Sequence, residues 1–151
     1  MKRLLWEVAK RIGARRPCAS EGALAKALLS RERLGSTAIG GGIAVPHMIL
    51  DDPWPPLILV TRLKNAIEYD APDEAAVDIL LSVVGNRNDL KWLQAAIPRF
   101  STLVKDRALA NELRTAGTVK EAGLVLARLG LQIMAGTSPD GALHATPSSP
   151  L

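Results

Sequence analysis

The stretch that decides the fold is LGSTAIGGGIAVPHMIL, residues 34–50, which contains three consecutive glycines and one of the chain's two histidines. Its first part, STAIGGGIAV, is rich in β-branched residues and is interrupted by Gly40, Gly41 and Gly42. This pattern predicts two short strands around a tight glycine turn, because glycine readily adopts the backbone angles that such turns need. His47 should follow the second strand directly, beside the rigid backbone of Pro46.

Two apolar runs follow this stretch. PLILVTRL, residues 56–63, and VDILLSVVG, residues 77–85, contain few polar residues. Such runs are typical of strands that are covered on both faces. We therefore expect an α/β fold, a single-domain sandwich in which helices flank both faces of a mixed β-sheet.

Helical segments are predicted on both sides of these strands in the sequence. Apolar residues recur at helical spacing between residues 3 and 12, and Ser20 can cap a second helix that ends near Glu32. Three helical segments are expected in the second half, at residues 88–104, 105–117 and 118–130. Pro98 should kink or divide the first of them, Asp106 should cap the second, and Thr118 with Glu121 forms the pattern of a capping box.

The chain changes character near its end. After about residue 131 it becomes rich in small residues, proline and serine and has no periodicity. We expect a domain at residues 1–131 and a flexible C-terminal tail at 132–151.

The charge and the cysteine content limit the classes of partner. The net charge is +4, and the basic excess gathers at the start of the chain, in Lys2, Arg3, Lys10, Arg11, Arg15 and Arg16. We interpret these residues as a solvated face of the first helix rather than a nucleic-acid surface, since only 3% of residues are aromatic. The lone Cys18 fits a reducing cytoplasm, and no apolar run is long enough for direct membrane insertion.

Several familiar sites are not supported by the sequence. The three glycines do not form a dinucleotide fingerprint or a P-loop, the histidines and Cys18 do not have the spacing of a zinc site, and no serine lies in a nucleophile elbow. No cofactor and no metal are therefore expected. Composition alone would make His47 a packed or surface histidine, but its rigid, glycine-flanked position suits a nucleophilic imidazole that captures a phosphoryl group.

The residues LLSRERLGSTAIGGGIAVPH, 28–47, closely resemble the active-site segment of the type-2 enzyme IIA family of the bacterial phosphoenolpyruvate:sugar phosphotransferase system. The Arg-Glu-x-Leu-Gly-Ser-Thr opening most resembles the nitrogen-regulatory branch of that family, beside its mannitol and fructose members. The resemblance continues through AIEYDAPDEAAVDILLSVVG and DLKWL and covers roughly residues 3–129.

The resemblance implies a function. In that family the histidine of the Pro-His motif, here His47, accepts a phosphoryl group from the phosphocarrier protein HPr. The arginine of the Arg-Glu motif, here Arg31, would stabilise the charge on the phosphoryl oxygens, and Arg33 is the weaker candidate. The downstream partner would be a regulatory target, a transporter or an enzyme IIB-like protein.

The sequence departs from the family pattern at three places. Asp89 stands where active members carry a second histidine. Its carboxylate either orients the His47 imidazole and repels an incoming phosphoryl group, or it merely caps its helix. Met48 and Ile49 replace a small residue and a basic residue. The family's first strand has no counterpart here, and an uncovered sheet edge would favour self-association. These departures support an alternative function, a phosphotransfer-impaired interaction module that regulates a transporter or a sensor kinase.

Overall fold

The computed structural model describes residues 1–16, 19–131, 133–134 and 142–145 of the 151-residue chain. The first half contains α1 (Lys2–Gly13), α2 (Glu21–Arg33), β1 (Ala38–Gly40), β2 (Ile43–Ala44), β3 (His47–Leu50), β4 (Leu57–Ile67) and β5 (Val77–Asn86). The second half contains the 3₁₀ turn η1 (Arg87–Asp89), α3 (Leu90–Ala96), the 3₁₀ turn η2 (Ile97–Phe100), α4 (Ser101–Lys105), α5 (Arg107–Thr115), α6 (Val119–Ala127), β6 (Ile133–Met134) and β7 (Ala142–Ala145). No helix in these ranges is both long and apolar enough to cross a membrane.

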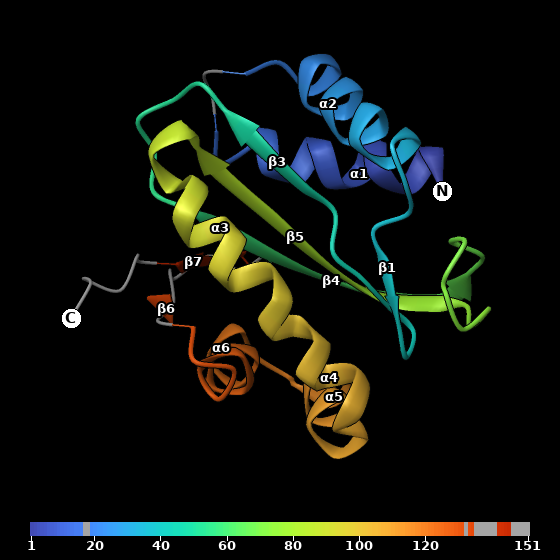
Figure 1. The fold of residues 1–151 in the computed structure, drawn as a ribbon. Coiled ribbons are helices and arrows are strands. Elements are labelled where there is room, and N and C mark those ends of the chain that lie inside the picture. Colours follow the sequence, from blue (N-terminus) through green and yellow to red (C-terminus); the bar gives the residue numbers. More distant parts are fainter. Residues whose placement is uncertain (17–18, 132, 135–141, 146–151) are drawn as a thin grey trace.

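The sheet is built around β5 (Figure 1). Its strand order is β1-β2-β5-β4-β7-β6, and β3 also pairs with β5. β4 runs antiparallel to β5 along one edge. β2 and β3 follow one another in parallel along the other edge, with Ala44 opposite Leu80 and His47 opposite Val83. The prediction of a mixed sheet in an α/β fold is confirmed.

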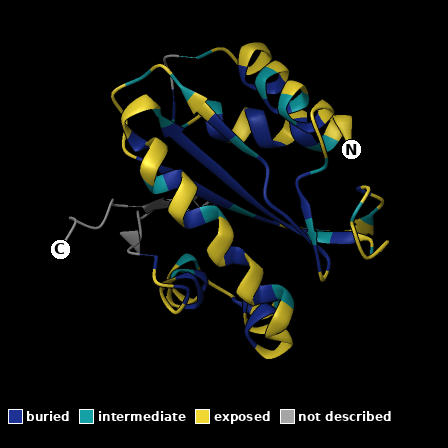
Figure 2. Ribbon diagram, viewed as in Figure 1, coloured by how far each residue is buried: buried dark blue, intermediate teal, exposed yellow. Residues whose placement is uncertain are grey.

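Alternate residues of β5 face two separate hydrophobic cores. Ile79, Leu81 and Val83 belong to the core that α3, α4, α5 and α6 cover, whereas Leu80 and Val84 belong to the core under α1 and α2. Figure 2 shows β5 buried between helices whose outward faces are exposed. The nearly continuous apolar sequence of this strand is the consequence of burial on both faces.

The predicted helix caps form through short-range hydrogen bonds. The side chains of Ser20 and Asp106 each accept a bond from a backbone N–H three residues further on. Thr118 accepts from the N–H of Glu121 at 3.1 Å. The carboxylate of Glu121, however, accepts from the N–H of Gly117 rather than that of Thr118, so only half of the predicted capping box forms.

Pro98 divides the helix predicted at 88–104. α3 ends at Ala96, residues Ile97–Phe100 form the 3₁₀ turn η2, and α4 begins at Ser101. A proline has no N–H to donate to the preceding turn of an α-helix, so the tighter turn takes its place.

Two short segments of the region expected as a flexible tail, 132–151, form strands. β7 pairs antiparallel with β4, where Leu57 lies opposite His144, and β6 pairs with β7. The edge of β4 that β5 does not cover has free backbone donors and acceptors. β7 hydrogen-bonds to them although its sequence has a low strand propensity. The other residues of the expected tail lie outside the described residues.

The solvated basic face predicted on the first helix is correct in part. Arg16 is buried, pairs with the carboxylate of Asp52 and donates to the carbonyl of Trp54 at 3.2 Å. It therefore attaches the end of the α1 region to the β3–β4 loop. The exposed members of the basic group are Lys2, Arg3, Lys10 and Arg11.

Candidate functional site

His47 is the first residue of β3, where an interrupted sheet edge resumes. Val45 and Pro46 separate it from the end of β2. The carbonyl oxygen of Pro46 accepts the N–H of Val83 at 2.8 Å, which keeps the interrupted segment attached to β5. The sequence predicts His47 directly after the second strand. In the structure His47 instead begins a third strand, β3, because Pro46 has no N–H with which to continue the pairing. The His47 side chain is half-buried.

Two hydrogen bonds determine the tautomer of His47. Arg31 donates its Nε–H to the imidazole Nε2 at 3.0 Å, and the imidazole Nδ1 lies 2.9 Å from the carbonyl oxygen of Val45. Arginine can only donate and a carbonyl can only accept. Nδ1 therefore carries the proton, and Nε2 presents an unprotonated lone pair.

The surroundings of His47 favour this neutral form. Burial lowers the pKa of His47 below its ordinary value, and the positive charge of Arg31 lowers it further. The hydrogen bond to Val45 and the negative charge of Glu32 act in the opposite direction on the pKa. Because burial is the largest of these effects, the neutral imidazole predominates at pH 7, and its Nε2 lone pair accepts the hydrogen bond from Arg31.

Arg31 links this imidazole to the turn between α2 and β1. It lies in the last turn of α2. Besides its bond to His47, it donates Nη1–H to the carbonyl oxygen of Gly35 at 3.0 Å. A single planar guanidinium therefore holds both groups, and the fold brings Arg31 and His47 together.

A buried polar cluster that sequence reasoning did not identify lies next to Arg31. The carboxylate of Glu32 accepts hydrogen bonds from the N–H of Thr37 at 2.7 Å, the hydroxyl of Thr37 at 2.6 Å and the hydroxyl of Tyr69 at 3.3 Å. Burial raises the pKa of the Tyr69 phenol well above its ordinary value, so this hydroxyl stays protonated as a donor. The only sequence signal was the closeness of Glu32 and Thr37 within the Arg-Glu-x-Leu-Gly-Ser-Thr motif.

The cluster connects to His47 through the backbone. The N–H of Val45 donates to the carbonyl oxygen of Thr37 at 2.9 Å, and the carbonyl of Val45 in turn accepts the proton of His47 Nδ1. Glu32 therefore holds Thr37, Thr37 holds Val45, and the carbonyl of Val45 orients the imidazole.

The triple glycine serves the hairpin turn between β1 and β2. Gly40, Gly41 and Gly42 all have positive φ, between 62° and 99°. The N–H of Gly41 donates to Asp73 at 2.8 Å, and its carbonyl accepts from Arg114 at 2.7 Å. Because both backbone groups of Gly41 have protein partners, the turn is a structural device that places β2 and, beyond it, His47.

Asp89 is the N3 member of a capping box whose N-cap is Asn86. Its carboxylate accepts the N–H of Asn86 at 2.8 Å, within a capping box at the start of η1. Asn86 pairs with Leu50, at the opposite end of β3 from His47. No hydrogen bond or ion pair joins Asp89 to His47 within the part of the chain that the structure describes.

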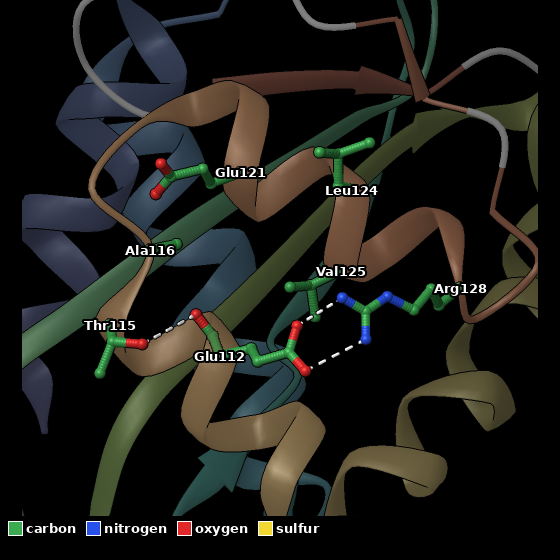
Figure 3. Close-up of a pocket in the computed structure, with 7 residues that line it drawn as sticks. All are labelled: Glu112, Thr115, Ala116, Glu121, Leu124, Val125 and Arg128. Atoms are coloured by element: carbon green, nitrogen blue, oxygen red, sulfur yellow. Dashed lines mark hydrogen bonds and ion pairs between the residues drawn. The ribbon is translucent and has the colours of Figure 1, made fainter.

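A shallow groove of about 260 Å³ lies elsewhere, between α5 and α6 (Figure 3). Glu112 and Arg128 form an ion pair across it, and Leu124 is exposed beside it. The groove shares no lining residue with the His47 site. Among the described residues, no cluster of three or more histidine, cysteine or carboxylate side chains has an arrangement suited to a metal ion.

The sequence and the two-core α/β sandwich of this chain match a known class of domain. The sequence profile of the family described as "Phosphoenolpyruvate-dependent sugar phosphotransferase system, EIIA 2" matches residues 1–128. The chain belongs to this family, as the sequence analysis predicted.

Known proteins resemble this chain in sequence or in fold. A nitrogen regulatory protein of Pseudomonas aeruginosa is 37% identical over 119 residues, which cover 79% of this chain and 77% of that protein. The nitrogen regulatory protein IIA-Ntr of Neisseria meningitidis has a similar fold, with a TM-score of 0.74, 23% identity and coverage of 83% and 85% of the two chains. The enzyme IIA mannitol protein of Escherichia coli, solved in complex with phosphorylated enzyme IIB mannitol, has a TM-score of 0.63 at 16% identity, with coverage of 84% and 87%.

Proposed function

We propose that this protein accepts a phosphoryl group from HPr on Nε2 of His47 and transmits it, or the signal of its presence, to a downstream protein. The observation that carries the proposal is the hydrogen bond from Arg31, which requires an unprotonated Nε2. The relatives among the nitrogen regulatory proteins support a regulatory output.

The transfer needs no additional acid or base. The lone pair of Nε2 forms a bond to phosphorus while the bond between phosphorus and the donor histidine breaks, and its electron pair returns to the donor imidazole. His47 gains positive charge in this step, and the Val45 carbonyl stabilises the Nδ1–H that remains. In such a loose, in-line transfer the protein contributes mainly position and charge.

Arg31 supplies the charge. In the free protein its Nε–H occupies the lone pair of Nε2, so the guanidinium must leave that position when phosphorus approaches. The same group can then donate to the phosphoryl oxygens, whose negative charge attracts it more strongly than a neutral imidazole does.

The surface around His47 suits protein partners. Ile49, two residues along β3, is 44% exposed, and Leu34, beside the turn that Arg31 holds, is 86% exposed. Exposed apolar side chains next to a reactive group favour contact with another protein. We assign this surface to HPr and then to the downstream regulatory target, transporter or enzyme IIB-like protein.

The proposal is tested with phosphoenolpyruvate, enzyme I and HPr. Intact-mass measurement should show one added phosphoryl group on the wild-type protein and none on His47→Ala. Arg31→Ala should slow the transfer strongly, whereas Arg33→Ala, which changes an exposed arginine on the same helix, should leave it unchanged. An unmodified wild type, beside HPr that is visibly phosphorylated, would reject this function and leave the phosphotransfer-impaired interaction module.

A further inference from the structure

Arg31 makes its two hydrogen bonds through one rigid group. Its Nε–H reaches Nε2 of His47 at 3.0 Å, and its Nη1–H reaches the carbonyl oxygen of Gly35 at 3.0 Å. The guanidinium is planar, and its N–H groups keep a fixed geometry relative to one another. Nε cannot shift by much unless Nη1 shifts as well, so the imidazole and the turn are mechanically connected.

The turn formed by residues 34–36 has room to move. The Leu34 side chain is 86% exposed. No heavy atom lies within 4 Å of the position that a Cβ on Gly35 would occupy, and Gly35 has a φ of 155°. The space on the Cβ side of Gly35 is therefore open, and hydrogen bonds to the Glu32 carbonyl and from Arg31 hold its backbone.

Strong contacts surround this turn and limit how far a change can spread. Thr37 is held by the carboxylate of Glu32, and the Ser36 hydroxyl donates to the carbonyl oxygen of Tyr69 at 2.8 Å. These bonds involve neither Arg31 nor His47. They persist when Arg31 moves, so the change is confined to Leu34, Gly35 and the start of Ser36.

A phosphoryl group on His47 cannot share the present position of Arg31. The 3.0 Å between Nε and Nε2 accommodates a hydrogen atom but no phosphorus atom with its oxygens. Once Nε2 is phosphorylated, Arg31 must move, and the Gly35 carbonyl either loses its charged donor or follows the guanidinium. Both events alter the turn.

We propose that Arg31 couples phosphorylation of His47 to the conformation of the Leu34–Gly35–Ser36 turn, so that a partner protein touching Leu34 distinguishes the two states. The inference rests on the proposed function, because it requires a phosphoryl group on Nε2. Arg31 thereby has a second role: it transmits the phosphorylation state of His47 Nε2 to the exposed side chain of Leu34.

The coupling is tested by ¹H–¹⁵N NMR of the full chain. The protein is phosphorylated in one sample by HPr and in another by potassium phosphoramidate, a small chemical donor to histidine. On phosphorylation the amide signals of residues 34–36 should shift. The change of the turn should also break the bond from the Gly35 N–H to the backbone carbonyl of Glu32. This amide should therefore exchange with solvent about fivefold faster, as expected for the loss of one hydrogen bond. The Gly41 amide, held by Asp73, serves as the internal control and should not change.

Variants separate this coupling from the general effect of a new charge. In Arg31→Ala, the signals of residues 34–36 should already be displaced without phosphorylation and should change little when the phosphoryl group is added. Arg33→Ala should behave as the wild type does. Far-UV circular dichroism and the Gly41 signal establish that each variant is folded.

The outcomes distinguish the two proposals. Phosphorylated wild-type protein with unchanged signals at residues 34–36 would overturn the coupling and leave phosphoryl acceptance intact. Unchanged signals of these residues in folded, unmodified Arg31→Ala would also overturn it, whether or not His47 is phosphorylated. If neither HPr nor phosphoramidate modifies the wild type, the proposed function is wrong. The coupling is then wrong as well, because it requires a phosphoryl group on His47.

Discussion

Replacing Glu32 tests whether the buried cluster supports both the fold and the site. Its carboxylate accepts three hydrogen bonds, from the N–H and hydroxyl of Thr37 and from the hydroxyl of Tyr69. Two variants remove different parts of this arrangement. Glu32→Gln keeps the shape and one acceptor oxygen, whereas Glu32→Leu removes every acceptor.

The expected costs follow from the donors that lose their partner. In Glu32→Gln the amide oxygen can still accept from the N–H of Thr37, and the two hydroxyls can rotate to accept from the new amide group. The loss is then mainly that of charge-assisted bonding, about 1–2 kcal/mol of unfolding free energy. In Glu32→Leu the buried N–H of Thr37 has no acceptor and two hydroxyls lose theirs, so the cost rises to about 3–5 kcal/mol.

Urea and thermal unfolding measure these costs, and the exposed Glu7→Gln is the matched control that should not change stability. Glu32→Leu should lower the melting temperature by about 10–15 °C. A second measurement is the pKa of His47 by NMR titration, which should fall in Glu32→Gln because the negative charge that raises it is removed. A Glu32→Leu protein as stable as the wild type, or an unchanged His47 pKa in folded Glu32→Gln, would refute the reasoning.

Three further predictions concern His47, the glycine turn and Asp89. Because burial lowers the folded-state pKa of His47, the unfolded chain binds more protons as the pH falls through about 6.5. Stability should therefore decrease on acidification through this range, and less so in His47→Ala; equal pH dependence in urea unfolding would contradict this. Gly42→Ala should lower the free energy of unfolding by about 2 kcal/mol or more, because φ is 78° and a Cβ would lie 2.9 Å from Arg114. Gly22→Ala is the control: its helical position is open, so the same urea assay should show no loss of stability. Asp89→Asn should keep its capping bond and the rate of phosphoryl transfer from HPr, and a large change in that rate would assign the carboxylate a direct role at His47.

Several elements could be predicted from the sequence because their causes are local. The Ser20, Asp106 and Thr118 caps each join a side chain to a backbone N–H three residues away, a relation that any helix start imposes. The strands β4 and β5 were visible as apolar runs because both of their faces are buried. The family resemblance likewise singled out His47 and Arg31, which the fold brings within 3.0 Å of each other.

Other features depended on which segments meet in space. β7 joins β4 because a free strand edge was available, although the tail sequence shows no strand pattern. Tyr69, in the loop between β4 and β5, reaches Glu32 in α2 across 37 positions of sequence.

The sequence by itself determined the order of the helices and of the strands β1, β2, β4 and β5, the glycine turn and the identity of the candidate nucleophile. Only the tertiary structure decided which nitrogen of His47 is unprotonated and that Arg31 joins it to the turn at Gly35. The physical reason is the range of the interactions involved. Capping and periodicity act within a few residues, whereas the protonation and contacts of a side chain depend on donors, acceptors and burial that distant segments supply.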